Sequence, residues 1–422
     1  GTDFLHRNAL VAGVDARHRW GGGHYEVKGS VLASRVQGST AALLRTQTAS
    51  ARLFQRPDRR DCALCMELDP ERTSLSGAAA TVDVTRIGGG HWRWNLTGAA
   101  RTQGFEMNDL GFQQQADAVA GFYRLDYVND TPIGAFRNWS AGVNGGLAWT
   151  MGGERTFHTT VLQGAFQLKN FWSATGGLMF LSPVVTPSML RGGPALRLQP
   201  REALFFGVYT DPRTRVRASL AGLFEYERGT DAYQVVLIPE LIYRPSSRAE
   251  LSVSPNLRTA TTSWQYLAAL PDGAGGQRYV GGRLAQTTLA VTARASYAFT
   301  PDLSLQLYAQ PFVGAGDYTG FSQVAQPRAR RFADRFAPTD PGTLGPAADF
   351  NVKQLRSNAV LRWEYRPGST LFVIWSQRRD GYLTDGTFGL GRDFGRLFGM
   401  SDEHNVPGTN VLAVKFTYWL DL

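Results

Sequence analysis

Hydrophobic and polar residues alternate along this chain with a period of two, in segments of ten or more residues. The segment 289–299 is apolar at nearly every odd position, including Val291, and small or polar at the even positions, including Thr292. After a short turn the pattern resumes, with Leu305 on one face and Gln306 on the other. A period of two is that of an extended strand whose two faces meet different surroundings. The pattern therefore predicts long β-strands with one apolar face.

The connections between these segments fall into two classes. One class is short and rich in turn-forming residues, at 21–23, 88–90, 169–170, 211–213, 245–247, 301–302 and 367–369. The other class is long, near 37–78, 103–115, 183–199, 316–352 and 381–407. Short turns at one rim and long loops at the other are typical of transmembrane β-barrels. We therefore expect the long connections to be extracellular loops.

Aromatic residues gather within a few positions of the short turns or of residue 422. Rings prefer the headgroup level of a membrane, whereas ordinary strand propensity would scatter them along the strands. The predicted aromatic girdle comprises Trp20, Tyr25, Trp92, Trp94, Tyr243, Tyr297, Trp363, Tyr365 and Tyr418.

The alternating segments predict an all-β fold of about seventeen strands. No segment approaches the ~18–20 uninterrupted apolar residues of a membrane helix. We predict one domain over residues 1–422, a large antiparallel transmembrane β-barrel. Bacterial single-chain barrels usually close with an even number of strands, so we expect at least one strand before Gly1. A soluble β-propeller is the rival fold, but the chain lacks the repeat of about 40–50 residues that propellers show.

Composition supports a membrane β-protein more than a soluble one. Of 422 residues, 43% are hydrophobic, 12% are aromatic and only 19% are charged, with a net charge of +9. Basic proteins bind nucleic acid, acidic polysaccharide or anionic lipid headgroups. The arginines are scattered singly instead of forming a stripe with stacking aromatics, so nucleic acid is not an expected partner.

Both signs of charge occur on the faces that a barrel would turn inward. The predicted lumen-lining residues are Arg93, Arg101, Arg215, Arg217, Glu225, Glu240, Arg294, Arg356, Arg362, Glu364 and Lys415. In a barrel of this width, mixed charges line a water-filled pore or pair across it into a plug-like network.

Two cysteines, Cys62 and Cys65, form a C-A-L-C motif in the first long connection. A loop disulfide, free thiols, and a metal or redox role are all open, and the disulfide suits an oxidising compartment. With no second cysteine pair in the sequence, the motif is only half a zinc site, and we expect no metal centre there.

Candidate chemistry elsewhere is sparse. Asp380 and Asp385, each followed by a glycine, could bind a calcium ion in that loop, the alternative being a solvated loop tip. The run Arg328-Ala329-Arg330-Arg331 with Arg335 suits either anionic groups or solvent. The six histidines do not accompany a nucleophile in any recognisable pattern, so we expect no enzymatic activity.

Three strings are similar to a known family: R-H-R-W-G-G-G at 17–23, G-F-E-M-N-D-L-G-F at 104–112 and L-R-S-N-A-V-L-R-W-E-Y-R-P-G-S at 355–369. They resemble a bacterial outer-membrane family of unknown function, in which a carbohydrate-binding family 9-like domain precedes a C-terminal β-barrel. The resemblance covers nearly the whole chain as the barrel part, without the carbohydrate-binding module. The 62–65 insert departs from the family pattern. The resemblance implies a location and an architecture, and it supplies no catalytic residues.

These observations lead to one functional expectation and one alternative. The first is an outer-membrane barrel with a polar lumen for passage or surface handling of polar solutes, with carbohydrates suggested by the resemblance alone. The alternative is a non-conducting anchor or docking platform for a surface binding module or complex. The expected partners are membrane lipid and lipopolysaccharide, a polar solute, and surface or periplasmic proteins.

Overall fold

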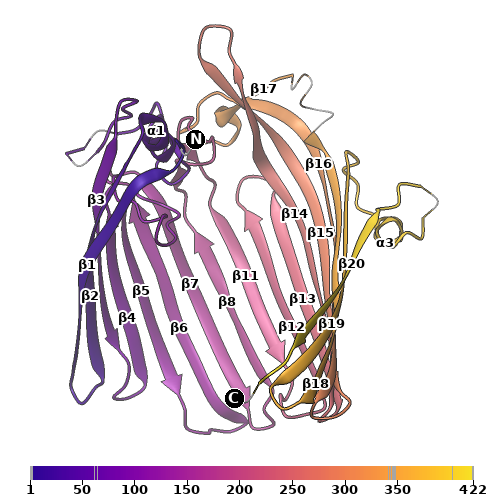
Figure 1. Ribbon diagram of the computed structural model, residues 1–422. Coiled ribbons are helices and arrows are strands. Elements are labelled where there is room, and N and C mark those ends of the chain that lie inside the picture. The colour runs from indigo at the N-terminus through magenta and orange to yellow at the C-terminus, as the bar shows by residue number, and fades with distance from the viewer. Residues whose placement is uncertain are drawn as a thin grey trace.

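A single large antiparallel sheet dominates the fold in this computed structural model (Figure 1). The structure describes residues 3–60, 62–63, 65–340, 342, 344, 348–401 and 403–420. In these described residues, seventeen strands follow one another up and down in chain order, each paired with its neighbours. The short β17 (Phe336–Pro338) adds to the end of β16. The expectations of an all-β fold and of about seventeen strands are confirmed.

The strands of the sheet are β1 (His6–Trp20), β2 (Tyr25–Gly38), β3 (Ser74–Arg86), β4 (Trp92–Arg101), β5 (Ala118–Asn129), β6 (Phe136–Trp149), β7 (Arg155–Leu168), β8 (Ser173–Leu181), β11 (Arg201–Tyr209), β12 (Val216–Glu227), β13 (Tyr233–Ser246), β14 (Ala249–Pro271), β15 (Gln277–Ala298), β16 (Leu303–Val324), β18 (Phe350–Arg366), β19 (Ser369–Leu383) and β20 (Gly408–Thr417). The connections contain α1 (Thr40–Thr48), the pair β9 (Val185–Thr186) and β10 (Leu196–Arg197), the 3-10 turn η1 (Ala333–Arg335), and α3 (Leu390–Phe398). None of the described helices is long and apolar enough to cross a membrane.

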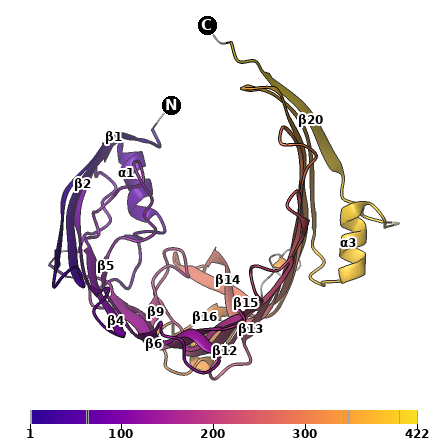
Figure 2. The ribbon, with the colours of Figure 1, turned by 90° about the horizontal axis from the view of Figure 1, so that it is seen from below.

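The sheet is curved, and α1 lies inside the curve (Figure 2). Leu43 of α1 packs with Val36 of β2 and Leu75 of β3 in a small buried core, so these strand residues face the concave side. Because side chains alternate along a strand, this contact assigns every second residue to the concave face, and the pairing registers carry the assignment from strand to strand.

The convex face is apolar and uncovered over most of its strands. Val14, Leu204 and Leu412 are 74%, 47% and 70% exposed, respectively. Val291 shares this face, whereas its neighbour Thr292 lies on the concave face. Water-facing sheets normally put polar residues outward, so the convex face has the inverse of a soluble protein's distribution.

The curved sheet is open in the described part of the chain. No pairing there joins β1 to β20, and Figure 2 shows the two strands apart. An odd number of alternating strands also makes β1 and β20 run in the same direction. The large antiparallel sheet is therefore observed, whereas its closure into a barrel is not.

Short turns lie at one rim, which we call the turn rim, and long connections lie at the other, the loop rim (Figure 1). The connection expected near 316–352 is shorter than that estimate, because β16 runs on to Val324 and β18 already begins at Phe350. Backbone pairing with β15 continues past Gly316, although glycines interrupt the alternation there. Residues 1–2, 61, 64, 341, 343, 345–347, 402 and 421–422 of the expected domain and loops lie outside the described residues.

Candidate functional site

Several connections of the loop rim meet on the concave side of the sheet. They are α1 with the described residues of 49–73, residues 102–117, the turn 150–154, residues 183–199 and residues 325–335, and we call them the inner loop cluster. Backbone contacts join its parts directly: the amide of Ala116 donates to Ala51, and the amide of Arg197 donates to Pro327. The cluster thus forms a body held against the wall from within.

Four charged side chains tie the inner loop cluster together, and we call them the Asp58–Glu154 network. Glu154, whose side chain is 2% exposed, accepts hydrogen bonds from both Arg56 and Arg328. Asp58 forms an ion pair with Arg56 at 2.9 Å, and it accepts hydrogen bonds from Arg328 at 2.5 Å and from the amide of Ala195 at 3.0 Å. One network therefore fixes four segments that are far apart in the sequence.

The network favours the charged form of Arg328. Burial alone would lower the pKa of Arg328, but hydrogen bonds from Arg328 to Glu154 and Asp58 outweigh burial and raise it. A buried charge is tolerated when it is paired and hydrogen-bonded, and costly when it is left alone. The network is therefore stable as a unit and sensitive to loss of one member.

Two further arginines are buried in the inner loop cluster. Arg52 pairs with Glu106 at 2.7 Å, with side chains 1% and 4% exposed, and burial lowers the pKa of Arg52 against the opposing effect of Glu106. Arg335 donates to the carbonyls of Ala329 and Arg197, each at 2.8 Å. Arg328 and Arg335 thus have internal partners, contrary to the anion-binding or solvated role considered for this run.

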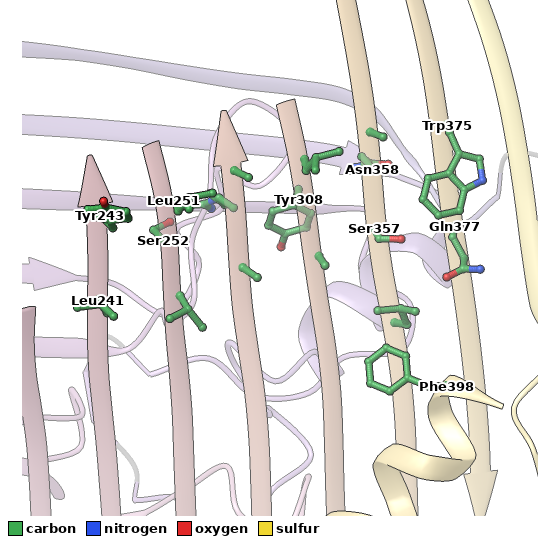
Figure 3. Close-up of a pocket in the computed structure, with 18 residues that line it drawn as sticks. Leu241, Tyr243, Leu251, Ser252, Tyr308, Ser357, Asn358, Trp375, Gln377 and Phe398 are labelled. Carbon is green, nitrogen blue, oxygen red and sulfur yellow. The ribbon is translucent and has the colours of Figure 1, made fainter. Parts of the chain in front are cut away.

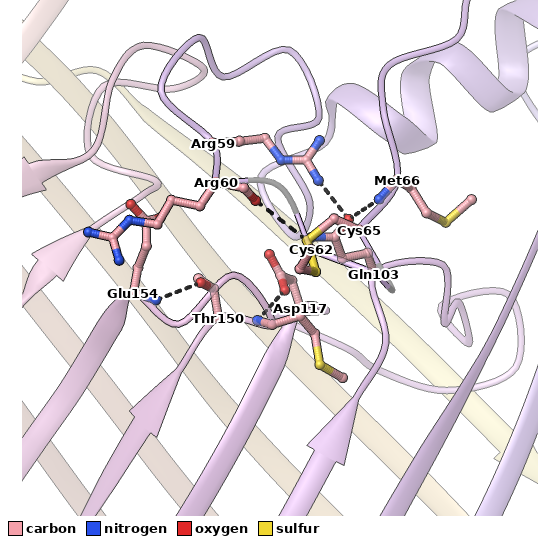
Figure 4. The surroundings of a disulfide bond; sticks show 10 residues. Arg59, Arg60, Cys62, Cys65, Met66, Gln103, Asp117, Thr150 and Glu154 are labelled. Atoms are coloured by element: carbon pink, nitrogen blue, oxygen red, sulfur yellow. Dashed lines mark hydrogen bonds between the residues drawn. A yellow bond between two sulfur atoms is a disulfide. The ribbon is translucent and has the colours of Figure 1, made fainter.

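The disulfide joins Cys62 to Cys65, with the sulfur atoms 2.03 Å apart. It lies beside the connection between β4 and β5 (Figure 4). The side-chain oxygen of Gln103 accepts from the amide of Met66 and from the guanidinium of Arg59, both at 2.6 Å. These bonds fasten the cysteine loop to the rest of the inner loop cluster.

The residues predicted to line a lumen lie on the concave face by register, except Arg215, which precedes β12 in a short turn. Several of them pair with an opposite charge. The pairs are Arg201–Glu225 at 2.9 Å, Arg217–Glu250 at 3.3 Å, Arg356–Asp380 at 2.5 Å and Arg362–Glu364 at 2.6 Å. The concave face is thus a polar surface with both signs of charge.

The aromatic residues predicted as a girdle lie on the convex face or directly beyond its strands, near the turn rim. Trp20 stacks on Tyr25 with ring centroids 5.6 Å apart, and Tyr365 stacks on Phe416 at 5.3 Å. Neighbouring rings on adjacent strands therefore form a partly continuous band on the outside of the sheet.

The two carboxylates considered for calcium are held by arginine. Asp380 lies on the concave face between Arg356 and Arg378. Asp385 lies past the end of β19, where hydrogen bonds from Thr387 lower its pKa and Arg392 pairs with it at 3.3 Å. In the described residues, His, Cys, Asp and Glu side chains form no group of three or more that would hold a metal ion.

A shallow apolar groove of about 710 Å³ runs along the convex face beside α3 (Figure 3). Leu241, Leu251 and Trp375 line it, and Phe398 at the end of α3 stands at one end. Asp393 of α3 forms a buried ion pair with Lys353 of β18, and their charged atoms lie 3.3 Å apart.

A second cavity, of about 560 Å³, lies on the other face, between the inner loop cluster and strands β4 to β7. Its floor consists of small concave-face residues such as Ala120 and Ala148, with Phe122 and Phe157 beside them. Arg52, Arg56, Arg59 and Arg101 contribute to its walls, and Asp117 is its one acidic lining residue among those described.

Sequence reasoning did not find the Asp58–Glu154 network. Glu154 occupies a short turn without periodicity, and Asp58 lies among arginines in an irregular loop. The excess of arginine around Asp58 was the one available signal, because buried guanidinium groups need carboxylate partners.

Fold and site together define a class of protein: a large curved antiparallel β-sheet, apolar outside and ionic inside, with loops folded against its inner wall. The chain belongs to the family described as a domain of unknown function, DUF5916, whose model matches residues 7–422. No curated protein matches it. A solved structure described as "Bacterial polysaccharide outer membrane secretin" is similar over 81% of this chain and 89% of that chain, at 12% identity and a TM-score of 0.33.

Proposed function

We propose that this chain forms the wall of an outer-membrane barrel and that polar solutes pass along, or are held at, its concave face. The observation that carries the proposal is the separation of the two faces. Exposed apolar side chains cover the convex face, while paired and unpaired charges occupy the concave one. Lipid outside and water inside would satisfy both faces, which a soluble setting would not.

In this proposal the inner loop cluster sets the width of the passage. The long connections belong to the extracellular rim, as in other transmembrane barrels, and the girdle near the turn rim lies at the periplasmic headgroups. The cluster fills part of the concave space, and the Asp58–Glu154 network keeps it there. Lipopolysaccharide and a polar solute, carbohydrate among them, are the proposed partners.

The buried network also favours a second candidate function. A loop body fixed by several buried ion pairs suits a rigid platform that anchors a binding module or a surface complex and conducts nothing. The two functions differ in whether water and ions cross the barrel.

Conductance of the purified protein in planar bilayers tests the proposal. We expect discrete openings whose conductance rises when the Asp58–Glu154 network is broken by Arg328→Gln. Liposome swelling with oligosaccharides of graded size would then give the size limit of the solute. If the protein inserts into the bilayer but never opens at any potential, the proposed passage of solutes is refuted and the non-conducting platform remains as the function.

A further inference from the structure

The cavity between the inner loop cluster and strands β4 to β7 is lined by small side chains of the sheet on one side and by loop residues on the other. Loop segments around Ser50, Gln115 and Thr186 cover it, and concave-face alanines form its floor. Alanines at these wall positions leave room that larger side chains would fill. Binding cavities are concave, mostly apolar and supplied with a few placed polar groups.

An aromatic pair stands beside this floor. Phe122 and Phe157 lie on the concave face, with ring centroids 6.2 Å apart, and remain 43% and 39% exposed. Phe122 pairs in register with Thr97, which hydrogen-bonds Asp83 on the same face, so the rings are not lipid-facing. These two adjacent exposed rings present an apolar surface that a ring-shaped ligand would cover.

Four arginines line the same space, and two of them are paired with carboxylates. Arg52 pairs with Glu106, and Arg56 pairs with Asp58 and Glu154. Arg101 is exposed and differs from them. Its guanidinium donates to the carbonyl of Gln115 at 3.2 Å, and no carboxylate of the described residues lies within ion-pair distance of it.

We propose that this cavity binds a small anionic solute that has a carboxylate or phosphate group and a ring with an apolar face. The ring lies against Phe122 and Phe157, and the anion meets Arg101 through charge-assisted hydrogen bonds. This inference deepens the proposed function, since it names the chemistry of the solute held at the concave face. An acidic sugar and an aromatic carboxylate both have this chemistry.

Four probes in a two-by-two design test the site by calorimetric titration of the full chain in detergent. Glucuronate and benzoate carry the anion, and glucose and benzyl alcohol are their neutral counterparts. We expect at least one anion to bind about tenfold more tightly than its counterpart, the effect of one charge-assisted hydrogen bond. The anion that binds more tightly identifies the kind of ring, sugar or aromatic. If neither anion binds more tightly than its neutral counterpart, the proposal is overturned.

Variants separate this site from general attraction to a basic surface. Arg101→Gln should weaken binding about tenfold, and replacement of Phe122 and Phe157 by leucine should weaken it further. Arg294 also lies on the concave face but does not line the cavity, so Arg294→Gln should leave the affinity unchanged. Equal losses in the Arg101 and Arg294 variants would refute the site. Binding in detergent does not require conductance. A protein that binds the anion but never conducts would therefore refute the proposed passage of solutes and leave this binding site standing.

Discussion

Glu154 holds two guanidinium groups in the interior of the inner loop cluster, and its charge is the centre of the network. Replacement by glutamine keeps the shape but removes that charge. Arg56 retains Asp58, so we expect a cost of about 3 kcal/mol, at the lower end of the range for breaking a buried ion pair. Hydrogen exchange of amides at residues 49–60 should accelerate accordingly.

A matched control is available at the surface. Glu202 pairs with Arg228, whose side chain is 62% exposed, and Glu202→Gln should cost under about 1 kcal/mol. Equal exchange rates in the two variants would mean that the Asp58–Glu154 network does not hold the cluster.

The attachment of α3 should depend on pH. Burial opposes ionisation of Asp393, but the Gly389 amide, Arg392 and Lys353 outweigh it and lower the pKa of Asp393. A carboxyl with a lowered pKa stabilises the folded state above its unfolded pKa, and this contribution is lost as pH falls through the folded value. Below about pH 4 we expect exchange of the α3 amides to rise.

Asp393→Asn should reproduce that release at neutral pH, because it leaves the buried ammonium of Lys353 without a charged partner. If the acid-induced rise persisted unchanged in this variant, another group would be responsible for the release.

Strands are the elements that the sequence predicts best here, because the period-two pattern directly reports two different environments. The ends of β16 were less predictable, since Gly316 and Gly320 carry no side chain to mark a face. Both α1 and α3 were missed. Each has nine residues, too few for a clear helical period, and α3 in addition packs against strands β16 and β18, which are distant from it in sequence.

The assignment of faces gives a prediction for adjacent residues of β15. In the proposed membrane, Val291→Arg puts a charge into lipid and should cost about 2–4 kcal/mol near mid-depth. Thr292→Arg places the same side chain on the polar concave face and should be tolerated. The folded fraction in liposomes measures both, and equal damage from the two substitutions would contradict the assignment.

At the scale of the molecule, the open edges of the sheet are the main constraint. Unpaired backbone groups are costly in lipid, so a membrane-embedded form needs the edges of β1 and β20 to be covered. These strands run in the same direction, and a direct contact between them would be a parallel pairing in an otherwise antiparallel sheet. Local alternation could not reveal this arrangement, because closure depends on the whole set of strands.

Spin labels on Val14 of β1 and Val414 of β20 would report how the edges are arranged in bilayers. We expect a narrow distribution of the distance between the two labels, centred at a small multiple of the spacing between neighbouring strands, which is about 4.8 Å. A broad distribution, or a separation as wide as the sheet, would contradict an embedded closed wall.

The most direct test of two-faced exposure is a nitroxide scan of residues 303–310 in liposomes, with oxygen and a water-soluble nickel chelate as relaxation agents. The account predicts that Leu303, Leu305 and Leu307 respond to oxygen, while Ser304, Gln306 and Tyr308 respond to nickel. Loss of this alternation, or its reversal, would contradict it.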